Sequence, residues 1–371
     1  MRIIVIGGAG FIGCNTARRF QKRGDDVVVI DNLSRRGARA NLDWLTQQGK
    51  LQFIKADVRD AQQMRSALGD CGDAAAVFHL AAQVAVTTSV ERPREDFEIN
   101  ALGTLNVLEA VREVGKGTLV VFASTNKVYG GMEDIAIGER AGVVPDECEG
   151  RYDYRDLTGG ISEDRILDFH SPYGCSKGAA DQYVRDYARI YGLRTVVLRQ
   201  SCIYGPRQFG IEDQGWVAWF AISAVLGQKI RIYGDGKQVR DLLHVDDLID
   251  AYELVVGKRD QMDGRIYNIG GGPKFSRSVL GLVHGLERLT GRPVPFQHFD
   301  WRPGDQPVYI SDISKAEKEL GWKPQINPDA GVQSLMHWVN DHRELVRSEL
   351  AELLSLTPTV QAEPLRQPAH A

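Results

Sequence analysis

The feature that most constrains this chain is a glycine-rich turn that directly follows a short apolar run at the N-terminus. The run Arg2–Ile6 leads into the segment GGAGFIG, in which Gly7, Gly10 and Gly13 fit G-x-x-G-x-x-G, and an overlapping G-x-G-x-x-G begins at Gly8. Glycines between a strand and a helix allow a sharp turn and let the backbone approach a pyrophosphate. The helix that follows presents free N–H groups to the anion. The pattern therefore predicts a dinucleotide site.

A carboxylate at the end of the next predicted strand strengthens this interpretation. Asp31 lies eighteen residues beyond Gly13. A carboxylate at this spacing accepts hydrogen bonds from the hydroxyls of the adenosine ribose and repels a 2′-phosphate, which favours NAD over NADP. Arg35 and Arg36 are a contrary signal, because a nearby arginine can bind that phosphate.

Short apolar runs alternate with helical patterns through the first half of the chain. Strands are predicted at Arg2–Ile6, Asp26–Asp31, Leu51–Lys55, Ala75–His79, Leu119–Ser124 and Thr195–Arg199, and helices at Phe11–Arg23, Ala61–Gly69, Glu95–Val114 and Tyr173–Tyr191. Such alternation predicts the α/β class, with a doubly wound parallel Rossmann sheet.

The second half is less regular and richer in glycine and proline clusters. Helices are predicted there at Trp216–Leu226, Val245–Val256, Ser278–Thr290 and Ile313–Leu320. We expect an NAD-binding Rossmann domain over residues 1–200 with part of 240–270, and a smaller mixed α/β substrate-binding lobe over about 201–239 and 271–345. The long polar connection 132–170 should be functional or locally folded, and residues 357–371 form a predicted disordered tail.

Composition argues against several classes of partner. The chain has 371 residues, with 49 acidic against 45 basic side chains and a net charge of −4, so it lacks the basic surface that nucleic acid requires. No stretch reaches the roughly 18 apolar residues of a membrane span. The apolar start is too short for a signal peptide, and the five cysteines form no C-x-x-C pair. We expect a cytoplasmic setting, no metal, and no nucleic-acid or membrane partner.

A candidate proton-relay pair stands at Tyr173 and Lys177, in a Y-x-x-x-K pattern. On a helix these two side chains share one face. A phenol titrates near pH 10, so acting as a base near neutrality requires its pKa to fall by about 3, a change of about 4 kcal/mol. A neighbouring ammonium and the positive nicotinamide ring of NAD⁺ would both stabilise the phenolate.

A second candidate group closes the fifth predicted strand. Ser124 and Thr125 stand at its carboxyl end, where open α/β sheets bind ligands. The segment Gly174–Gly178 also reads as G-x-S-x-G, but no strand leads into it, which argues against a hydrolase. Ser176 is therefore expected on the helix surface or against the cofactor.

Taken together, these motifs resemble the extended short-chain dehydrogenase/reductase family, specifically its NAD-dependent epimerase/dehydratase branch of nucleotide-sugar enzymes, over roughly residues 1–345. The resemblance implies a catalytic triad of Thr125, Tyr173 and Lys177, with Ser124 as the alternative hydroxyl. The implied contacts to NAD are Gly7, Gly10, Phe11, Ile12, Gly13, Asp31, Asn32, Ser34, Arg35, Asp57, Val58, Leu80, Ala81, Ala82, Gln83, Asn100, Ser124, Tyr173 and Lys177.

Residues 124–130, 167–183 and 213–217 resemble those family members that epimerise CDP-linked sugars at C2. The implied reaction oxidises C2 transiently to a ketone and returns the hydride to the other face. Related 4,6-dehydratases carry an Asp-Glu pair after the catalytic Thr, where this chain has Asn126-Lys127, which argues against dehydration. The implied substrate is a nucleotide-diphosphate sugar, with a CDP-hexose favoured, and its implied contacts are Gln83, Asn126, Gln208, Trp216, Tyr233, Arg240 and Arg302, with Asn268 a weaker candidate.

Two other functions remain open. One keeps the same site and acts as a nucleotide-sugar 4-epimerase or an NAD-linked sugar dehydrogenase. The other is a non-catalytic NAD-sensing regulator, which predicts loss of the Tyr/Lys pair, although both residues are present. The resemblance also implies a homodimer formed through Glu95–Val114 and Tyr173–Tyr191, with a tetramer as the alternative.

Overall fold

A seven-stranded parallel sheet forms the centre of the computed structural model, which describes residues 1–114, 117–302 and 305–355. The strand order is β13-β8-β5-β4-β1-β2-β3. The strands are β1 (Arg2–Ile6), β2 (Asp26–Asp31), β3 (Gln52–Lys55), β4 (Ala76–His79), β5 (Leu119–Thr125), β8 (Arg194–Gln200) and β13 (Asp263–Ile269). The α/β prediction is thus confirmed, while the predicted tail lies outside the described residues.

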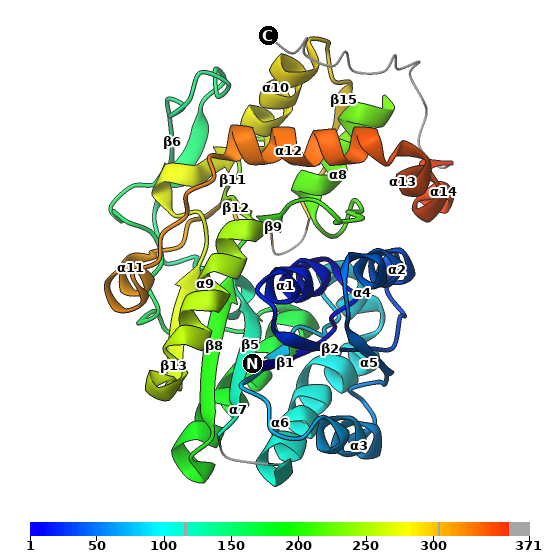
Figure 1. Ribbon diagram of the computed structural model, residues 1–371. Coiled ribbons are helices and arrows are strands. Elements are labelled where there is room, and N and C mark those ends of the chain that lie inside the picture. Colours follow the sequence, from blue (N-terminus) through cyan, green and yellow to red (C-terminus); the bar gives the residue numbers. More distant parts are fainter. Residues whose placement is uncertain (115–116, 303–304, 356–371) are drawn as a thin grey trace.

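Both faces of the sheet are covered, which explains the continuous apolar runs of the sequence. Ile3 and Val5 of β1 join one buried cluster, and Ile4 and Ile6 join another on the opposite face. The first cluster packs against α1 (Phe11–Lys22), α2 (Ala38–Gln48), α9 (Val245–Gly257) and α11 (Ser314–Leu320) (Figure 1). The second packs against α3 (Ala61–Cys71), α6 (Gly103–Val114) and α7 (Ser171–Tyr191).

The helix expected over Glu95–Val114 is divided into three segments. The short helix α5 (Pro93–Phe97) leads into a π-helical turn at Glu98–Leu102, and α6 follows without a break. Another short helix, α4 (Val86–Glu91), lies before α5. A π turn is rare and is often found at functional sites, because it holds one residue more than an α turn.

The second half of the chain forms a mixed lobe with its own apolar core. In Figure 1, helices α8 (Trp216–Leu226), α10 (Val279–Thr290) and α12 (Pro328–Asp341) lie together above the sheet. The remaining elements are β9 (Ile203–Tyr204), β10 (Ile230–Tyr233), β11 (Val239–Asp241), β12 (Leu243–His244), β14 (Ser276–Ser278), β15 (Phe296–Phe299), β16 (Val308–Tyr309), α13 (Arg343–Glu349) and α14 (Ala351–Leu354). Where one domain ends and the next begins remains a prediction.

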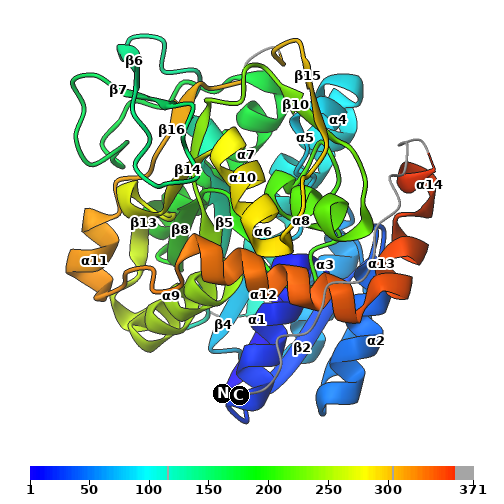
Figure 2. The same cartoon turned by 90° about the horizontal axis from the view of Figure 1, so that it is seen from above.

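The connection 132–170 is locally folded, as expected. It contains an antiparallel hairpin of β6 (Ile137–Arg140) and β7 (Arg151–Tyr154), which projects beside β16 at the rim of the molecule (Figure 2). Tyr154 packs with the mixed lobe in a small buried cluster that includes Val239 and Val308. Within the described parts of the chain, no helix is both long and apolar enough to span a bilayer.

Candidate active site

The glycine turn lies between the carboxyl ends of β1 and β4, at the point where the strand order reverses. Gly7 has a φ of +78°, and a Cβ there would lie 2.5 Å from the backbone nitrogen of Ala81. A Cβ at Gly13 would lie 2.2 Å from the carbonyl oxygen of Gly7. Helix α1 then begins after Gly10 without a side-chain cap and without an acidic residue in its first turn. The cradle therefore fits a pyrophosphate.

The ribose side of this cradle is held by Asp31 at the end of β2. Its carboxylate accepts the N–H groups of Ala9 at 3.0 Å and Leu33 at 2.7 Å, which fixes it beside the glycine turn. Burial raises the pKa of Asp31, and these two hydrogen bonds oppose the rise. An oxygen so oriented can still accept a ribose hydroxyl, because each carboxylate oxygen has two acceptor sites.

The predicted adenine-side residues lie next to Asp31. The amide of Asn32 donates to Asp57 at 2.9 Å, and the Arg59 guanidinium holds the pKa of Asp57 at about 2. Val58 is buried. Ser34 and Arg35 are exposed, and the Arg35 guanidinium donates to Gln214 at 2.6 Å on the far side of the site.

A cavity of about 320 Å³ opens at the carboxyl ends of β4, β5 and β8. Such a volume and a mixed polar and apolar lining are typical of ligand sites. It brings together eleven of the predicted site residues, namely Phe11, Ile12, Leu80, Ala82, Ser124, Thr125, Asn126, Tyr173, Lys177, Gln208 and Trp216.

Thr125 and Tyr173 meet in this cavity from β5 and α7. Burial raises the pKa of Tyr173 to about 12, and a hydrogen bond with Thr125 opposes that rise. Burial lowers the pKa of Lys177 to about 7, while Asp181 and Asp96 favour its ammonium form. The Lys177 ammonium donates to the carbonyl of Ala123 at 2.6 Å. The protein alone therefore keeps the phenol protonated at neutral pH.

The neighbouring hydroxyl of Ser124 has a different partner. It donates to Asp181 at 2.7 Å, and this buried carboxylate also pairs with Arg199 at 3.0 Å. The geometry therefore favours Thr125 over Ser124 as the hydroxyl beside Tyr173.

A buried polar network lies behind the cavity. Asn100, on the π turn, accepts the Gln83 backbone N–H at 2.9 Å and donates to the Ser176 hydroxyl at 3.1 Å. Ser176 donates to Asp96 at 2.5 Å, so the expectation that it lies on the helix surface was wrong. The side-chain amide of Gln83 donates to Asp96 at 3.0 Å and is not among the cavity-lining groups. Gln83 and Asn100 thus shape the wall from behind.

The substrate side contains the two arginines predicted to bind a diphosphate, and both are held by carboxylates. Arg240 donates to Asp305 at 2.6 Å. Arg302 pairs with Asp213 at 2.8 Å and lies 4.0 Å from the ring centre of Tyr233. Of these residues only Asp213 lines the cavity, so the structure does not bring Tyr233, Arg240 or Arg302 to its wall.

Asn268 is not part of this site. Its amide oxygen accepts the Tyr129 hydroxyl at 2.7 Å, and its amide nitrogen donates to the carbonyl of Ile161 at 2.8 Å. Because the side chain is fully buried, the suggestion that it contacts base or ribose was wrong.

Sequence reasoning did not select Lys127, which lines the cavity two residues after Thr125. Its ammonium donates to Gln306 at 3.3 Å and lies 4.0 Å from Asp305. Burial and the positive charge of Arg240 lower the pKa of Lys127 to about 8. The signal in the sequence that could have found it is its position two residues after the strand-end hydroxyl of Thr125.

Comparisons with known proteins agree with this geometry. Residues 3–270 match the NAD dependent epimerase/dehydratase family. The chain is 43% identical to CDP-paratose 2-epimerase of Salmonella typhi over 92% of its own length and 99% of the relative, and 31% identical to UDP-glucose 4-epimerase of Mycolicibacterium smegmatis over 90% and 96%. A crystal structure of DesIV, a dTDP-glucose 4,6-dehydratase from Streptomyces venezuelae with NAD and TYD bound, superposes with a TM-score of 0.78 at 29% identity, covering 94% of this chain and all of that one. With its glycine cradle, ribose acid and Tyr/Lys pair on a parallel sheet, the chain belongs to the NAD dependent epimerase/dehydratase family.

Proposed function

We propose that this protein epimerises a CDP-linked hexose at C2 by transient oxidation to a 2-keto sugar. The observation that carries the proposal is the convergence of Thr125, Tyr173 and Lys177 on one cavity beside the glycine cradle. The choice of position and base is supported by the 43% identity to a CDP-paratose 2-epimerase.

When bound in the cradle, NAD⁺ supplies a hydride acceptor and a positive charge beside the cavity. The Tyr173 hydroxyl, whose pKa of about 12 is too high for a base at neutrality, requires such a charge in order to ionise. As phenolate it takes the proton of the sugar C2 hydroxyl, and as phenol it returns that proton. Thr125 positions the sugar hydroxyl against Tyr173, and Lys177 holds the ribose hydroxyls. No net oxidation results.

The groups after Thr125 favour epimerisation over dehydration. Loss of water requires an additional acid and base at the sugar. Here the cavity presents the neutral amide of Asn126 and the ammonium of Lys127 at these two positions. A cation next to Arg240 suits the charge of a substrate diphosphate better than it suits elimination.

Isotope transfer tests the reaction. The protein is incubated with C2-deuterated and unlabelled CDP-hexoses without added NAD, and the products are analysed by mass spectrometry and NMR. Retention of deuterium at C2 of the epimer supports internal hydride return. Washout of deuterium contradicts it and indicates epimerisation by proton abstraction. A product changed at C4, or a net oxidised sugar, would instead indicate a 4-epimerase or a dehydrogenase.

Tyr173→Phe tests the base. This variant should retain NAD and lose turnover by about 10³-fold, within the usual range for a general base. Undiminished activity would remove Tyr173 from this role, and an inactive variant that fails to bind NAD would be uninformative about chemistry, so bound cofactor is measured in the same sample.

Exposed apolar side chains support the proposed homodimer. Phe97 and Leu102 on the α5 and π-helical segment, and Tyr183, Ile190 and Tyr191 on α7, are all exposed. These segments are the two that were expected to form a four-helix contact. The Ile190 side chain is 66% exposed. Light scattering of the wild type and of the Ile190→Glu variant therefore tests whether α7 lies in the dimer interface. An unchanged mass for the variant would exclude that interface.

A further inference from the structure

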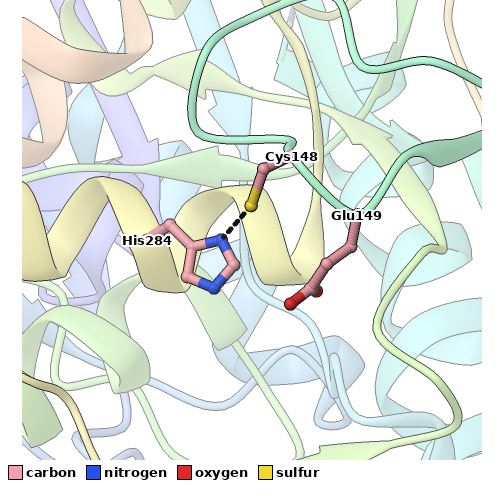
Figure 3. A group of neighbouring side chains, drawn as sticks. All are labelled: Cys148, Glu149 and His284. Carbon is pink, nitrogen blue, oxygen red and sulfur yellow. Dashed lines mark hydrogen bonds between the residues drawn. The ribbon is translucent and has the colours of Figure 1, made fainter.

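A second cluster of chemically reactive side chains lies outside the cavity, where the insertion meets α10. Cys148 and Glu149 are exposed at the centre of a tight turn, which is closed by the Gly150 N–H donating to the Glu147 carbonyl at 3.0 Å. A thiol sulfur, a carboxylate oxygen and a ring nitrogen of His284 all lie within 4.8 Å of one another. Figure 3 shows these three side chains gathered from two separate segments.

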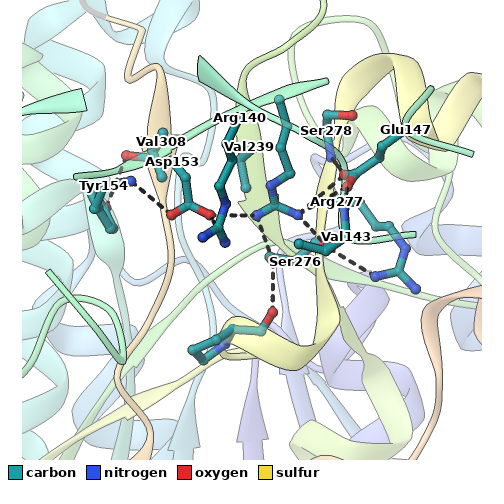
Figure 4. A network of polar contacts seen from close by, with 12 residues as sticks. Arg140, Val143, Glu147, Asp153, Tyr154, Val239, Ser276, Arg277, Ser278 and Val308 are labelled. Carbon is teal, nitrogen blue, oxygen red and sulfur yellow. Dashed lines mark hydrogen bonds and ion pairs between the residues drawn. The ribbon is translucent and has the colours of Figure 1, made fainter. Parts of the chain in front are cut away.

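The turn that carries Cys148 is attached to the start of α10 through Glu147. The buried carboxylate of Glu147 accepts the N–H of Ser278 at 2.7 Å and that of Val143 at 2.9 Å (Figure 4). Ser278 is the N-cap residue of α10, the helix that carries His284. Arg151, also buried, pairs with Glu147 at 3.3 Å. The position of Cys148 relative to α10 is thus set by a buried hydrogen bond from Ser278 to Glu147, whose carboxylate is also held by Arg151.

The preceding residue, Asp146, orients the histidine itself. Its carboxylate pairs with Arg288, one helical turn beyond His284, at 2.6 Å. Its carbonyl oxygen lies 3.0 Å from Nδ1 of His284, and the Cys148 sulfur lies 3.8 Å from the same nitrogen. In histidines that bind metals, the ring nitrogen that does not touch the ion usually donates to a carbonyl or carboxylate, so with Nδ1 donating to Asp146 the nitrogen left to bind the ion is Nε2.

We propose that Cys148, Glu149 and His284 bind a divalent transition-metal ion, with Zn²⁺ as the preferred species. One thiolate, one imidazole and one carboxylate form a donor set that suits Zn²⁺, and solvent completes the coordination. Binding releases the thiol proton of Cys148 to solvent.

The ion joins the insertion to the mixed lobe. The hairpin already contacts β11 and its flanking loop, since the Tyr152 N–H donates to the Lys237 carbonyl at 3.0 Å. A metal bridge from Cys148 to His284 adds a second attachment on α10. The expected role is to stabilise the insertion against the lobe that contains Arg240, and not to take part in the reaction.

Cobalt provides a direct test, because a cysteine thiolate bound to Co²⁺ gives a charge-transfer band in the near ultraviolet. The full-length protein is stripped with chelator and titrated with CoCl₂, and then with ZnCl₂ as competitor. We expect one equivalent of Co²⁺ per chain, and displacement by Zn²⁺. Cys148→Ser should abolish the band. His284→Gln removes one of the three proposed ligands and should weaken Co²⁺ binding by at least about tenfold, which is already the smallest loss found for residues that only support a ligand.

Cys175→Ser is the matched control, because Cys175 is also exposed but lies on α7. It should keep both the band and the stoichiometry. Added Zn²⁺ should raise the unfolding temperature of the wild type and of Cys175→Ser, and not that of Cys148→Ser. The proposal is overturned if no stoichiometric binding occurs, if the band survives Cys148→Ser, or if Cys175→Ser removes it. Because the readouts are spectroscopic and thermal, failure of the proposed epimerase activity would not affect them.

Discussion

The residues predicted to bind the cofactor and those predicted to bind the substrate are held in place in different ways. On the cofactor side, the glycine turn is fixed by backbone sterics, as at Gly13, and Asp31 is fixed by main-chain N–H groups. On the substrate side, the charged groups hold one another, as Arg240 does with Asp305 and Arg302 with Asp213.

This difference indicates which existing interactions each ligand must displace in order to bind. A dinucleotide meets a preformed cradle, whereas a diphosphate competes with carboxylates for its arginines. Truncating one partner of such a pair leaves the other uncompensated, so its effects differ from those of adding a side chain to a rigid turn. Four predictions test this comparison.

Gly13→Ala should have the largest effect. The new Cβ would lie 2.2 Å from the Gly7 carbonyl, so the turn must open. We expect NAD affinity to fall by at least about 100-fold, near 2.7 kcal/mol, when measured by calorimetry. Gly69→Ala on α3 is the matched control, because a Cβ there meets nothing within 4 Å. Equal NAD affinity in both variants would contradict a sterically fixed cradle.

Thr125→Val should have the next largest effect. It removes the hydrogen bond with Tyr173, and kcat should fall by about 10- to 100-fold, as expected for a hydrogen bond to a charged group. Ser124→Ala instead removes a bond to Asp181, so we expect it to lower the free energy of unfolding by about 1–2 kcal/mol. Steady-state kinetics and urea unfolding of both variants measure these two effects. A greater loss of kcat in Ser124→Ala than in Thr125→Val would indicate that Ser124, and not Thr125, is the catalytic hydroxyl.

Arg240→Met should raise KM for the nucleotide sugar by about tenfold, equal to about 1.4 kcal/mol, and leave NAD affinity unchanged. Arg277→Met is the control, since Arg277 lies directly opposite Arg240 on the neighbouring strand and donates to a backbone carbonyl. If the two variants raise KM equally, the effect belongs to the strand pair and not to a phosphate contact.

Lys127 should give the smallest effect, and it should depend on pH. Burial lowers its pKa to about 8, so the ammonium is present below that pH and is lost above it. We expect kcat/KM to fall as pH rises through about 8 in the wild type, by less than about tenfold because the group is only half-buried. Lys127→Arg keeps its charge and should lack this step. A step of equal size in both proteins would assign it to another group.

The sequence predicted the sheet well because its information is local. Each of the six expected strands is present within one or two residues, because most of them are buried on both faces and so carry continuous apolar runs, whereas the edge strand β3 is partly exposed. The seventh strand, Asp263–Ile269, was not among them. It contains a glycine and three polar or charged residues, and it joins the sheet only by pairing with β8. Helix α2 was also missed, and it begins after a left-handed Gly37 with no capping side chain.

The site residues likewise differ in whether local sequence spacing could identify them. Glycines, Asp31, Tyr173 and Lys177 were found from their spacing, because each stands at a fixed distance from a strand or helix end. The cluster proposed to bind a metal was not found in this way, because His284 lies more than one hundred residues after Cys148 and no spacing rule connects them. The surface position expected for Ser176 and the ligand contact suggested for Asn268 were wrong for the same reason. Their partners, Asp96 and Tyr129, come from distant segments.

The π turn at Glu98–Leu102 has a consequence for how this chain tolerates changes in length. Removing one residue there would restore ordinary α-helical pairing. It would also rotate everything before the turn by about 100° relative to α6. Asn100 would then face away from Gln83, and the loop that lines the cofactor cavity would lose its support. Deleting a single residue from this helical segment would therefore disrupt the active site.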